Sequence, residues 1–541
     1  MNVLKKSSTG VYLMIGIIIT TFLYFLPLFI KGFSINAFLA PLLNNVEGFS
    51  GSLFRSLIFA IISSLFNITV GFFIALLLKH ISIISLSGRQ LSWFLLPVIL
   101  GNASVAFIFK VSLFNTHFFN NIIQAGSYSH FSLLLLLQFW QFGFLFAYLF
   151  WSNFHSINES KLGFAKAFKL NSWEILKDIT LPLSKNLGVL LFLIGFVFAF
   201  YESAKSQFVF KASQGTNTEL ISHWLERTYH SKLLVNLDYA TSYVFKSSLL
   251  VFISSLLTFL IIGMILNFLL QKISRTKGTD TRRFTICNNI YIKRFSKIIF
   301  LLTCFFIILL PVTIVFCEIG VKFSNQISKL TLPLGLTLVS ATLTTLFSLT
   351  FAIIARLVFK NTLQNFNSSS MILFALLFML LLFPSIAILL SGFQWLSWLG
   401  YNSNIMIYFV WVSGHAVLLS PLLIGFLILI HFQIKVVEIE YISAYRLQLR
   451  EIFINSFIKR FKAEYIFTLI IACSFIWNEA VLNIILSDRI PSFAANLQMM
   501  FVGRAANYQL AASYLIVSIL LAVISIILWQ KILKKAAVAI D

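Results

Sequence analysis

The feature that most limits how this chain can fold is a series of apolar runs, each about twenty residues long. A helix of that length crosses the roughly 30 Å hydrocarbon core of a bilayer. Inside lipid the backbone polar groups must be satisfied within the segment, so each run is predicted to be a helix. The predicted fold class is therefore an all-α polytopic membrane protein with about twelve transmembrane helices. The predicted spans are 11–30, 54–78, 91–113, 131–151, 186–204, 244–270, 297–317, 331–358, 371–391, 404–430, 464–485 and 509–530.

Composition and charge exclude the main soluble classes. Of the 541 residues, 59% are hydrophobic and 11% are charged, which is too little charge to cover a soluble surface. The net charge of +23 comes from Lys and Arg in alternate short loops, which favours membrane orientation over nucleic-acid binding. This asymmetry predicts a multi-pass membrane protein with both termini in the cytoplasm. The four cysteines lack paired spacing, and no metal or cofactor is expected.

Two basic, helix-like stretches between apolar runs repeat in one register. They are 163–182 and 440–459, and they begin 277 residues apart. At that offset identical residues align, including Glu202 with Glu479 in the following spans; the others are Ala167 with Ala444, Leu170 with Leu447, Glu174 with Glu451 and Ile175 with Ile452. A fixed offset across a loop and the next span indicates a duplicated unit. It predicts two pseudo-symmetric six-helix halves, 1–280 and 281–541.

Residues 163–182 resemble the cytoplasmic "EAA" loop of binding-protein-dependent ABC importer permeases. Trp173, Leu176 and Pro182 occupy the family's aromatic, apolar and Leu-Pro positions, whereas Gly163 and Lys169 replace its Glu and Gly. In the second copy Glu440 keeps the acidic position and Phe453 the apolar one, while Arg446 replaces the glycine. The single chain with two halves resembles ferric iron, thiamine or phosphonate permeases, and Trp477-Asn478-Glu479 resembles carbohydrate permeases.

The resemblance implies a type I ABC importer permease of the bacterial inner membrane, with an ATPase-coupling loop in each half. The loop residues that it implicates are Gly163, Ala167, Lys169, Leu170, Trp173, Leu176, Pro182, Glu440, Ala444, Arg446, Leu447 and Phe453. The implied partners are two copies of an ABC ATPase subunit, a periplasmic or lipid-anchored solute-binding protein, and membrane lipid. Read from its residues alone, the first loop is a short helix with an apolar and a basic face, and an interfacial helix on anionic lipid remains the alternative.

Polar residues in or beside the spans are the candidates for the solute pathway. Glu202 and Glu479 are expected near the outer ends of their spans, where they line a gate or cap a helix. His415 follows Gly414 in the tenth span and is a third candidate, with a packing role as its alternative.

The chain itself is expected to perform no covalent chemistry. It contains no Gly-Lys dipeptide, and therefore no phosphate-cradling G-x-x-x-x-G-K-[ST] loop, so ATP hydrolysis is assigned to a separate subunit. An ion-gradient-driven secondary transporter, which also commonly has twelve spans in two repeats, is the alternative from another class. A non-transporting permease-like scaffold is the third.

Overall fold

The computed structural model describes eleven stretches of the chain together with isolated residues between them. The stretches are 48–81, 91–115, 127–156, 175–202, 205–206, 219–233, 237–275, 328–359, 383–400, 403–431 and 508–538; the isolated residues are 26, 298, 302, 308, 309, 312, 313, 470, 493, 496 and 497. Everything that follows concerns these residues.

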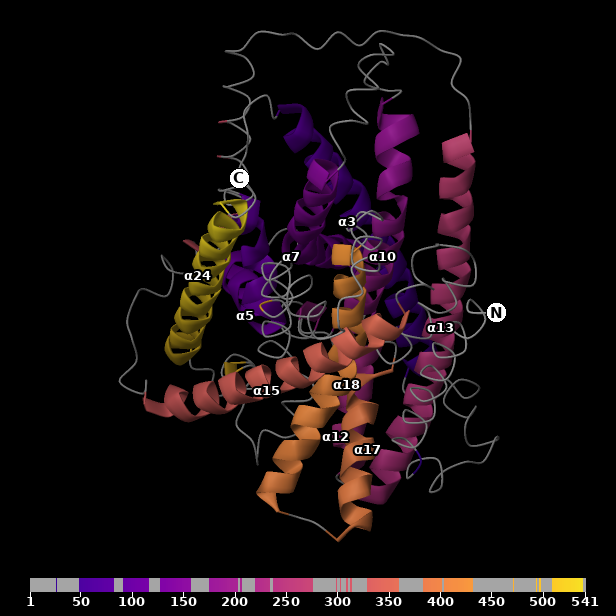
Figure 1. The fold of residues 1–541 in the computed structure, drawn as a ribbon. Helices are drawn as coiled ribbons and strands as arrows, with labels where there is room; N and C mark the ends of the chain where they lie inside the picture. The colour runs from indigo at the N-terminus through magenta and orange to yellow at the C-terminus, as the bar shows by residue number, and fades with distance from the viewer. Residues whose placement is uncertain are drawn as a thin grey trace, which may run out of the picture.

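All the elements of the described stretches are helical (Figure 1). In chain order they are α3 (Phe49–Ile81), the short 3-10 helix η2 (Ser92–Leu95), α5 (Leu96–Asn115), α7 (Ser127–Ser156), the π-helical turn η3 (Ile175–Thr180), α10 (Leu181–Phe200), α12 (Ile221–Leu233), α13 (Leu237–Arg275), α15 (Ser328–Phe359), α17 (Ser385–Trp398), α18 (Asn404–His431) and α24 (Tyr508–Val538). This agrees with the predicted all-α class.

Six helices of the described chain are long and apolar enough to cross a membrane. They contain Phe49–Leu78, Ser92–Val111, His130–Phe154, Tyr243–Ile262, Thr331–Ser348 and Leu510–Lys531, and each overlaps a span predicted from the sequence. The predicted spans 186–204 and 404–430 coincide with α10 and α18. The predicted spans 11–30, 297–317 and 464–485 lie outside the described residues, apart from single positions.

The most closely packed part of the structure is the group formed by α3, α7 and α10, in which each helix contacts the other two. Glycine allows the close approach: a Cβ on Gly71 of α3 would lie 3.1 Å from the Ala147 backbone nitrogen of α7. A Cβ on Gly195 of α10 would lie 3.1 Å from the Phe146 ring and 3.4 Å from the Ser64 hydroxyl. Small residues at helix contacts let backbones approach where lipid offers no hydrophobic driving force between helices.

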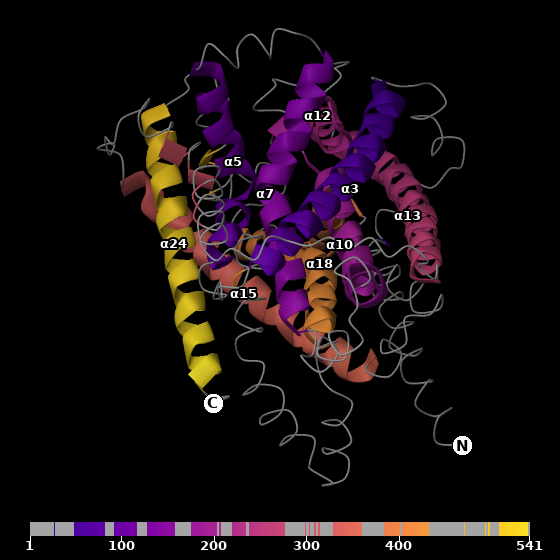
Figure 2. The same ribbon diagram turned by 90° about the horizontal axis from the view of Figure 1, so that it is seen from above.

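Aromatic pairs show how α3 and α7 are aligned. The ring centroids of Phe59 and Phe131 are 5.7 Å apart, and those of Phe66 and Phe139 are 5.3 Å apart. The partner numbers rise together along the two helices, so α3 and α7 run in the same direction. Figure 2, seen from above, shows these two helices crossing beside α10.

The helices α15 and α18 form a second pair, held by three side-chain hydrogen bonds. Ser340 donates to the Tyr408 hydroxyl at 2.7 Å, Thr344 to the Val412 carbonyl at 3.4 Å and Ser348 to the Ala416 carbonyl at 3.2 Å. Each bond joins residues 68 positions apart, so these helices also run in the same direction.

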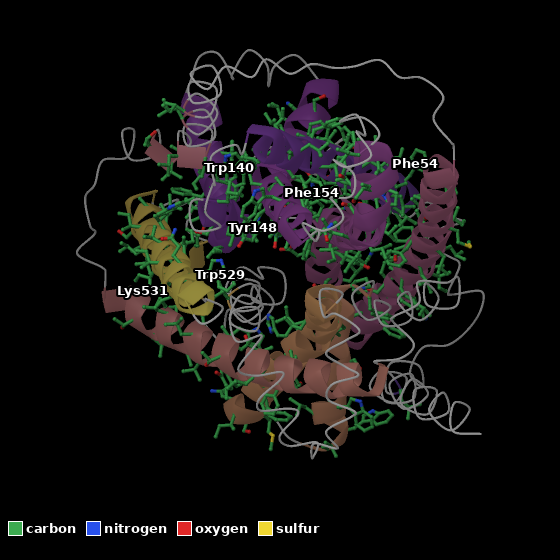
Figure 3. All side chains as sticks on the ribbon, turned by 45° about the horizontal axis from the view of Figure 1, so that its top comes forward. Phe54, Trp140, Tyr148, Phe154, Trp529 and Lys531 are labelled. Atoms are coloured by element: carbon green, nitrogen blue, oxygen red, sulfur yellow. The ribbon has the colours of Figure 1, made fainter. Side chains whose placement is uncertain are left out.

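Helices distant in the sequence pack side by side in two places, which Figure 1 shows as α24 beside α5 and α17 beside the lower part of α13. In the first place α24 packs on α5, where Ser104 donates to the Ser518 hydroxyl at 3.3 Å. In the second, α13 packs against α17, and the Phe252 and Phe383 ring centroids are 5.0 Å apart. Each predicted half therefore contributes its last helix to a contact with the other. In Figure 3, Trp529 of α24 is turned toward the neighbouring helices, whereas Lys531 lies on the outer side.

Two elements differ from the sequence predictions. The predicted span 371–391 is wrong at its outer end, because the helical segment there begins at Ser385 and continues to Trp398, into the predicted loop 392–403. Pro384 lies just before this helix in an extended conformation, since a proline in the helix interior would remove a backbone hydrogen bond. The predicted outer loop 205–243 contains α12 and the first turns of α13.

Candidate functional site

Most of the predicted coupling-loop residues lie outside the described residues. This holds for Gly163, Ala167, Lys169, Leu170, Trp173, Glu440, Ala444, Arg446, Leu447 and Phe453, and also for the pathway candidate Glu479. Their roles stay predictions.

The end of the first predicted loop is described where it joins α10. Leu176 lies in the π-helical turn Ile175–Thr180, half-buried against the core, and α10 begins directly at Leu181. Pro182 lies in the first turn of α10. The residues alone predict that this proline ends the loop helix and starts the next span; the predicted end of the helix is wrong, because the turn Ile175–Thr180 continues directly into α10. Thr180 is buried at the junction. The helical path is therefore continuous from residue 175 to the far end of α10.

Glu202 follows that far end and forms a fully buried ion pair. Its Oε2 lies 2.6 Å from the Lys205 Nζ, and its Oε1 accepts the Lys205 backbone N–H at 2.7 Å. Lys205 Nζ also donates to Gln138 Oε1 of α7 at 2.7 Å and lies 5.7 Å from the centre of the Phe142 ring. The pair thus fastens the end of α10 to α7.

Both side chains of the ion pair have no exposed surface. Burial lowers the pKa of Lys205, and the Glu202 carboxylate acts in the opposite direction. Removing one partner of a buried pair leaves an uncompensated charge, which typically costs about 3–5 kcal/mol. The sequence singled out Glu202 but gave Lys205 and Gln138 no role.

His415 is buried near the middle of α18. Its Nδ1 lies 2.8 Å from the Trp411 carbonyl, so this nitrogen carries the proton, and Nε2 has no partner among the described residues. The Trp411 ring packs edge-on at 5.1 Å. At the offset of 277 residues, His415 corresponds to Gln138, whose Nε2 likewise has no partner within the described structure.

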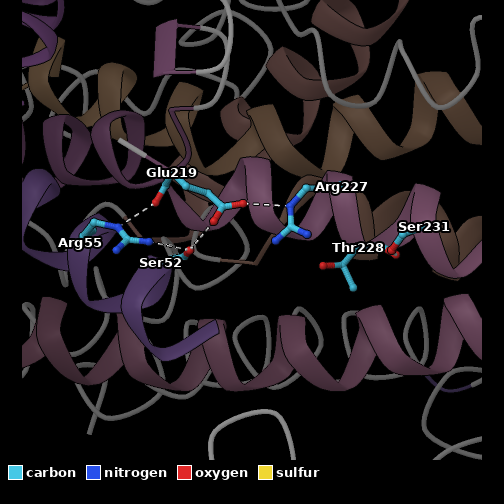
Figure 4. A network of polar contacts seen from close by, with 6 residues as sticks. All are labelled: Ser52, Arg55, Glu219, Arg227, Thr228 and Ser231. Carbon is cyan, nitrogen blue, oxygen red and sulfur yellow. Dashed lines mark hydrogen bonds and ion pairs between the residues drawn. The ribbon is translucent and has the colours of Figure 1, made fainter. Parts of the chain in front are cut away.

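A second polar network joins α12 to the start of α3 (Figure 4). Glu219 is fully buried, and its Oε1 lies 3.0 Å from Arg227 Nε. Its Oε2 accepts the Ser52 hydroxyl at 3.4 Å, and its backbone carbonyl accepts Arg55 Nε at 3.2 Å. The Ile221 backbone N–H, at the first residue of α12, donates to Ser56 at 2.7 Å. This network fixes α12 across the start of α3, on the side that the charge pattern places outside.

Four buried polar side chains on α3 and α7 hold polar atoms without a partner among the described residues, and of these only Gln138 contacts the Glu202–Lys205 pair. Their atoms without a hydrogen-bond partner in the described stretches are Ser63 Oγ, Asn67 Nδ2 and Oδ1, Gln138 Nε2 and Gln141 Oε1. A buried polar group left unpaired costs roughly 1–3 kcal/mol. The four side chains do not form one group, because Gln141 lies two residues from Phe139 and Gly143, which contact α3, and therefore on the opposite side of α7.

The sequence contained a signal for these positions that the loop comparison did not use. Asn67, Gln138 and Gln141 each interrupt a long apolar run, and polar residues within spans are usually functional. The pairing of Gln138 with His415 in the register of the predicted repeat is a second signal. Among the described residues no group of three or more His, Cys, Asp or Glu side chains is arranged to hold a metal ion.

The fold defines a class, that of helical, multi-pass membrane proteins, through its six long apolar helices. Comparison with known proteins adds no name within that class: no family model matches the chain, and a search of curated proteins finds no significant relative.

Proposed function

We propose that this chain is the membrane-spanning permease subunit of an ATP-driven ABC importer. It forms the pathway for a small solute, while two separate ATPase subunits bind its cytoplasmic loops. A solute-binding protein delivers the solute at the outer face of the bacterial inner membrane. The chain makes and breaks no covalent bond; ATP-driven movement of the loops alternates which side of the pathway is open.

The observation that carries the proposal is that the helix pair α3–α7 is matched by a second pair, α15–α18. Ser127 and Asn404, the first residues of α7 and α18, are separated by the same 277 residues as the two predicted loops. α3 packs on α7 and α15 packs on α18, and both pairs are parallel. A duplicated unit with one cytoplasmic loop per copy is what two ATPase subunits would need.

The junction after the first loop supports a mechanical role for it. Residues 175–200 form one uninterrupted helical path from the loop end to the buried Glu202–Lys205 pair. A displacement of the loop would therefore move the outer end of α10, because a helix transmits displacement along its axis. The buried ion pair then acts as the point at which α10 holds α7.

The test is co-purification with the ATPase from native membranes. The tagged full-length chain is expected to retain an ATPase subunit, identified by its phosphate-cradling motif, and Lys169→Glu or Arg446→Glu should reduce its recovery about tenfold, as loss of a charged interface contact does. Lys232→Glu on α12 is the matched charge reversal, and it should leave recovery unchanged. Equal recovery with all three variants would contradict the proposal.

One observation favours the second candidate, a transporter driven by an ion gradient. A buried carboxylate–ammonium pair beside the spans is the type of group that proton-coupled transporters use. Uptake by the purified chain alone in proteoliposomes, driven by a proton or sodium gradient, would establish this alternative. Uptake that requires the ATPase and ATP would exclude it.

A further inference from the structure

Two arginines at the start of α3 share one carboxylate, and Figure 4 shows them on either side of it. Arg227 Nε lies 3.0 Å from Glu219 Oε1, and Arg55 Nε donates to the Glu219 backbone carbonyl at 3.2 Å. Arg55 Nη2 donates to the Ser52 hydroxyl at 3.2 Å, and neither bond uses Nη1. Arg227 is 24% exposed and Arg55 is half-buried, whereas Glu219 and Glu226, the carboxylate of α12 itself, are buried. The two guanidiniums therefore bring positive charge to the surface, and both carboxylates lie beneath it.

The position of Arg55 along α3 places it at the boundary of the hydrocarbon. The apolar segment Phe49–Leu78 has 30 residues. At 1.5 Å per residue its length is about 45 Å, roughly 15 Å more than the hydrocarbon core. When the excess is divided equally between the two ends, the hydrocarbon begins about five residues into the segment, next to Arg55. The arginine pair is therefore at the level of the lipid headgroups.

An exposed apolar stripe continues from Arg55 along the same face of α3. Its members are Ile62 and Phe66, which follow Arg55 by one and by three helical turns and are 42% and 41% exposed. From Arg55 to Phe66 the helix rises about 16 Å, which is close to the depth of one leaflet of the hydrocarbon core. A basic pair at headgroup level above an apolar stripe of this length matches the shape and chemistry of a phospholipid.

The second helix pair provides a matched surface without the arginines. At the offset of 277 residues, the counterparts of the stripe and its arginine are Leu332, Val339 and Leu343 of α15. All three are exposed, as the α3 stripe is. Both helices therefore present apolar side chains to lipid, but at the position of Arg55 the second has a leucine.

We propose that Arg55 and Arg227 bind the phosphate of an anionic phospholipid whose acyl chain lies on Ile62 and Phe66. A guanidinium binds a phosphate through two parallel N–H···O bonds. A phosphatidylglycerol headgroup carries one negative charge and offsets the positive charge that Glu219 leaves. A phosphatidylcholine headgroup also carries a quaternary ammonium, so its net charge offsets none. The proposal depends on the membrane location of the chain and is independent of the transport function above.

Photo-crosslinking in nanodiscs tests the site. The purified full-length chain carries Ile62→p-benzoylphenylalanine, and the nanodiscs contain equal parts of dioleoyl phosphatidylglycerol and dioleoyl phosphatidylcholine. The matched control carries Val339→p-benzoylphenylalanine together with Lys329→Gln, which removes the basic residue at the start of α15. Mass spectrometry of the adducts gives the ratio of the two lipids captured at each position.

The probe at position 62 should capture phosphatidylglycerol about fivefold more than phosphatidylcholine, the factor expected for one basic charge near an anionic surface. The probe at position 339 should capture the two lipids equally. The same ratio at both positions overturns the proposal, and this comparison leaves both arginines in place, so it does not depend on a variant that fails to fold.

Changing the arginines tests their part in the site. Arg55→Gln and Arg227→Gln should each lower the ratio at position 62 toward one. A ratio that neither change lowers overturns the assignment to the arginines.

The alternative occupant of this surface is an acidic protein partner. A Phe54→p-benzoylphenylalanine probe beside Arg55 distinguishes the two in native membranes, because Phe54 is 64% exposed. A lipid adduct at this position is the expected result, and a protein adduct in its place overturns the proposal.

Discussion

The two parallel helix pairs of this chain hold similar polar residues in different states. In α15–α18, Ser340, Thr344 and Ser348 donate hydrogen bonds to the facing helix. In α3–α7, Ser63 and Asn67 have no partner among the described residues, and glycine at position 71 replaces the third hydroxyl. Polar contacts hold α15 to α18. Close approach at glycine and aromatic packing hold α3 to α7, where Ser63 and Asn67 have no partner in the described part of the chain.

The difference shows that a shared register does not impose a shared role. Side-chain hydrogen bonds between membrane helices contribute about 0.6 kcal/mol each on average, so three of them make α15–α18 a modestly stabilised scaffold. The α3–α7 pair is held instead by close backbone approach and by aromatic contacts.

The largest expected effect is at the ion pair that anchors the first helix pair. Glu202→Ala should lower the free energy of unfolding by about 3–5 kcal/mol, because Lys205 is left buried without a counter-charge. Thermal unfolding of the purified protein in detergent measures it. The double change Glu202→Gln with Lys205→Met should recover most of the loss, and a double variant as unstable as Glu202→Ala would contradict the interpretation.

A smaller effect is expected where the backbones of α3 and α7 are closest. Gly71→Leu should cost about 1–3 kcal/mol, because its Cβ would lie 3.1 Å from a backbone nitrogen of α7 that cannot move aside. The matched control in the second pair is Gly335→Leu in α15, where a Cβ would meet nothing within 4 Å. Thermal unfolding should show no loss for this control. Similar losses for both variants would remove the distinction between the two helix pairs.

The smallest effect has opposite signs in the two pairs. Asn67→Leu should stabilise the protein by roughly 1 kcal/mol, because it removes two unpaired polar atoms from the interior. Thr344→Val should destabilise it by about 0.6 kcal/mol, the average for a hydrogen bond between membrane helices. Chemical denaturation of both variants in one detergent gives the comparison. A destabilising Asn67→Leu would show that the amide is satisfied in the folded protein.

The sequence predicted the helices well because length and apolarity suffice to define a membrane span. It was wrong about where the span 371–391 ends, because α17 begins after Pro384 and continues past residue 391 to Trp398. It placed α12 in a loop, because only the buried Glu219 and its hydrogen bonds to α3 show that this segment packs against the bundle.

At the site, the alignment of Glu202 with Glu479 in the predicted repeat identified Glu202 as a candidate. The sequence did not show which residues Glu202 contacts. The partner Lys205 lies three residues later, past the end of the predicted span 186–204, and no role was assigned to it from the sequence. Gln138 enters the cluster from a helix more than sixty residues earlier, which only the packing of α7 on α10 reveals. His415 was selected for its own polarity, and its hydrogen bond to Trp411 lies within its own helix.

The last helix of each predicted half packs against the other half, and this has a consequence for how the chain is assembled. α24 rests on α5 and α13 rests on α17, so neither predicted half encloses its own interior, and cutting the chain between them would expose apolar faces on both fragments. Two such fragments made together should recombine without a covalent joint, whereas either made alone should be degraded. The connection between the halves then serves mainly to deliver equal numbers of complementary parts.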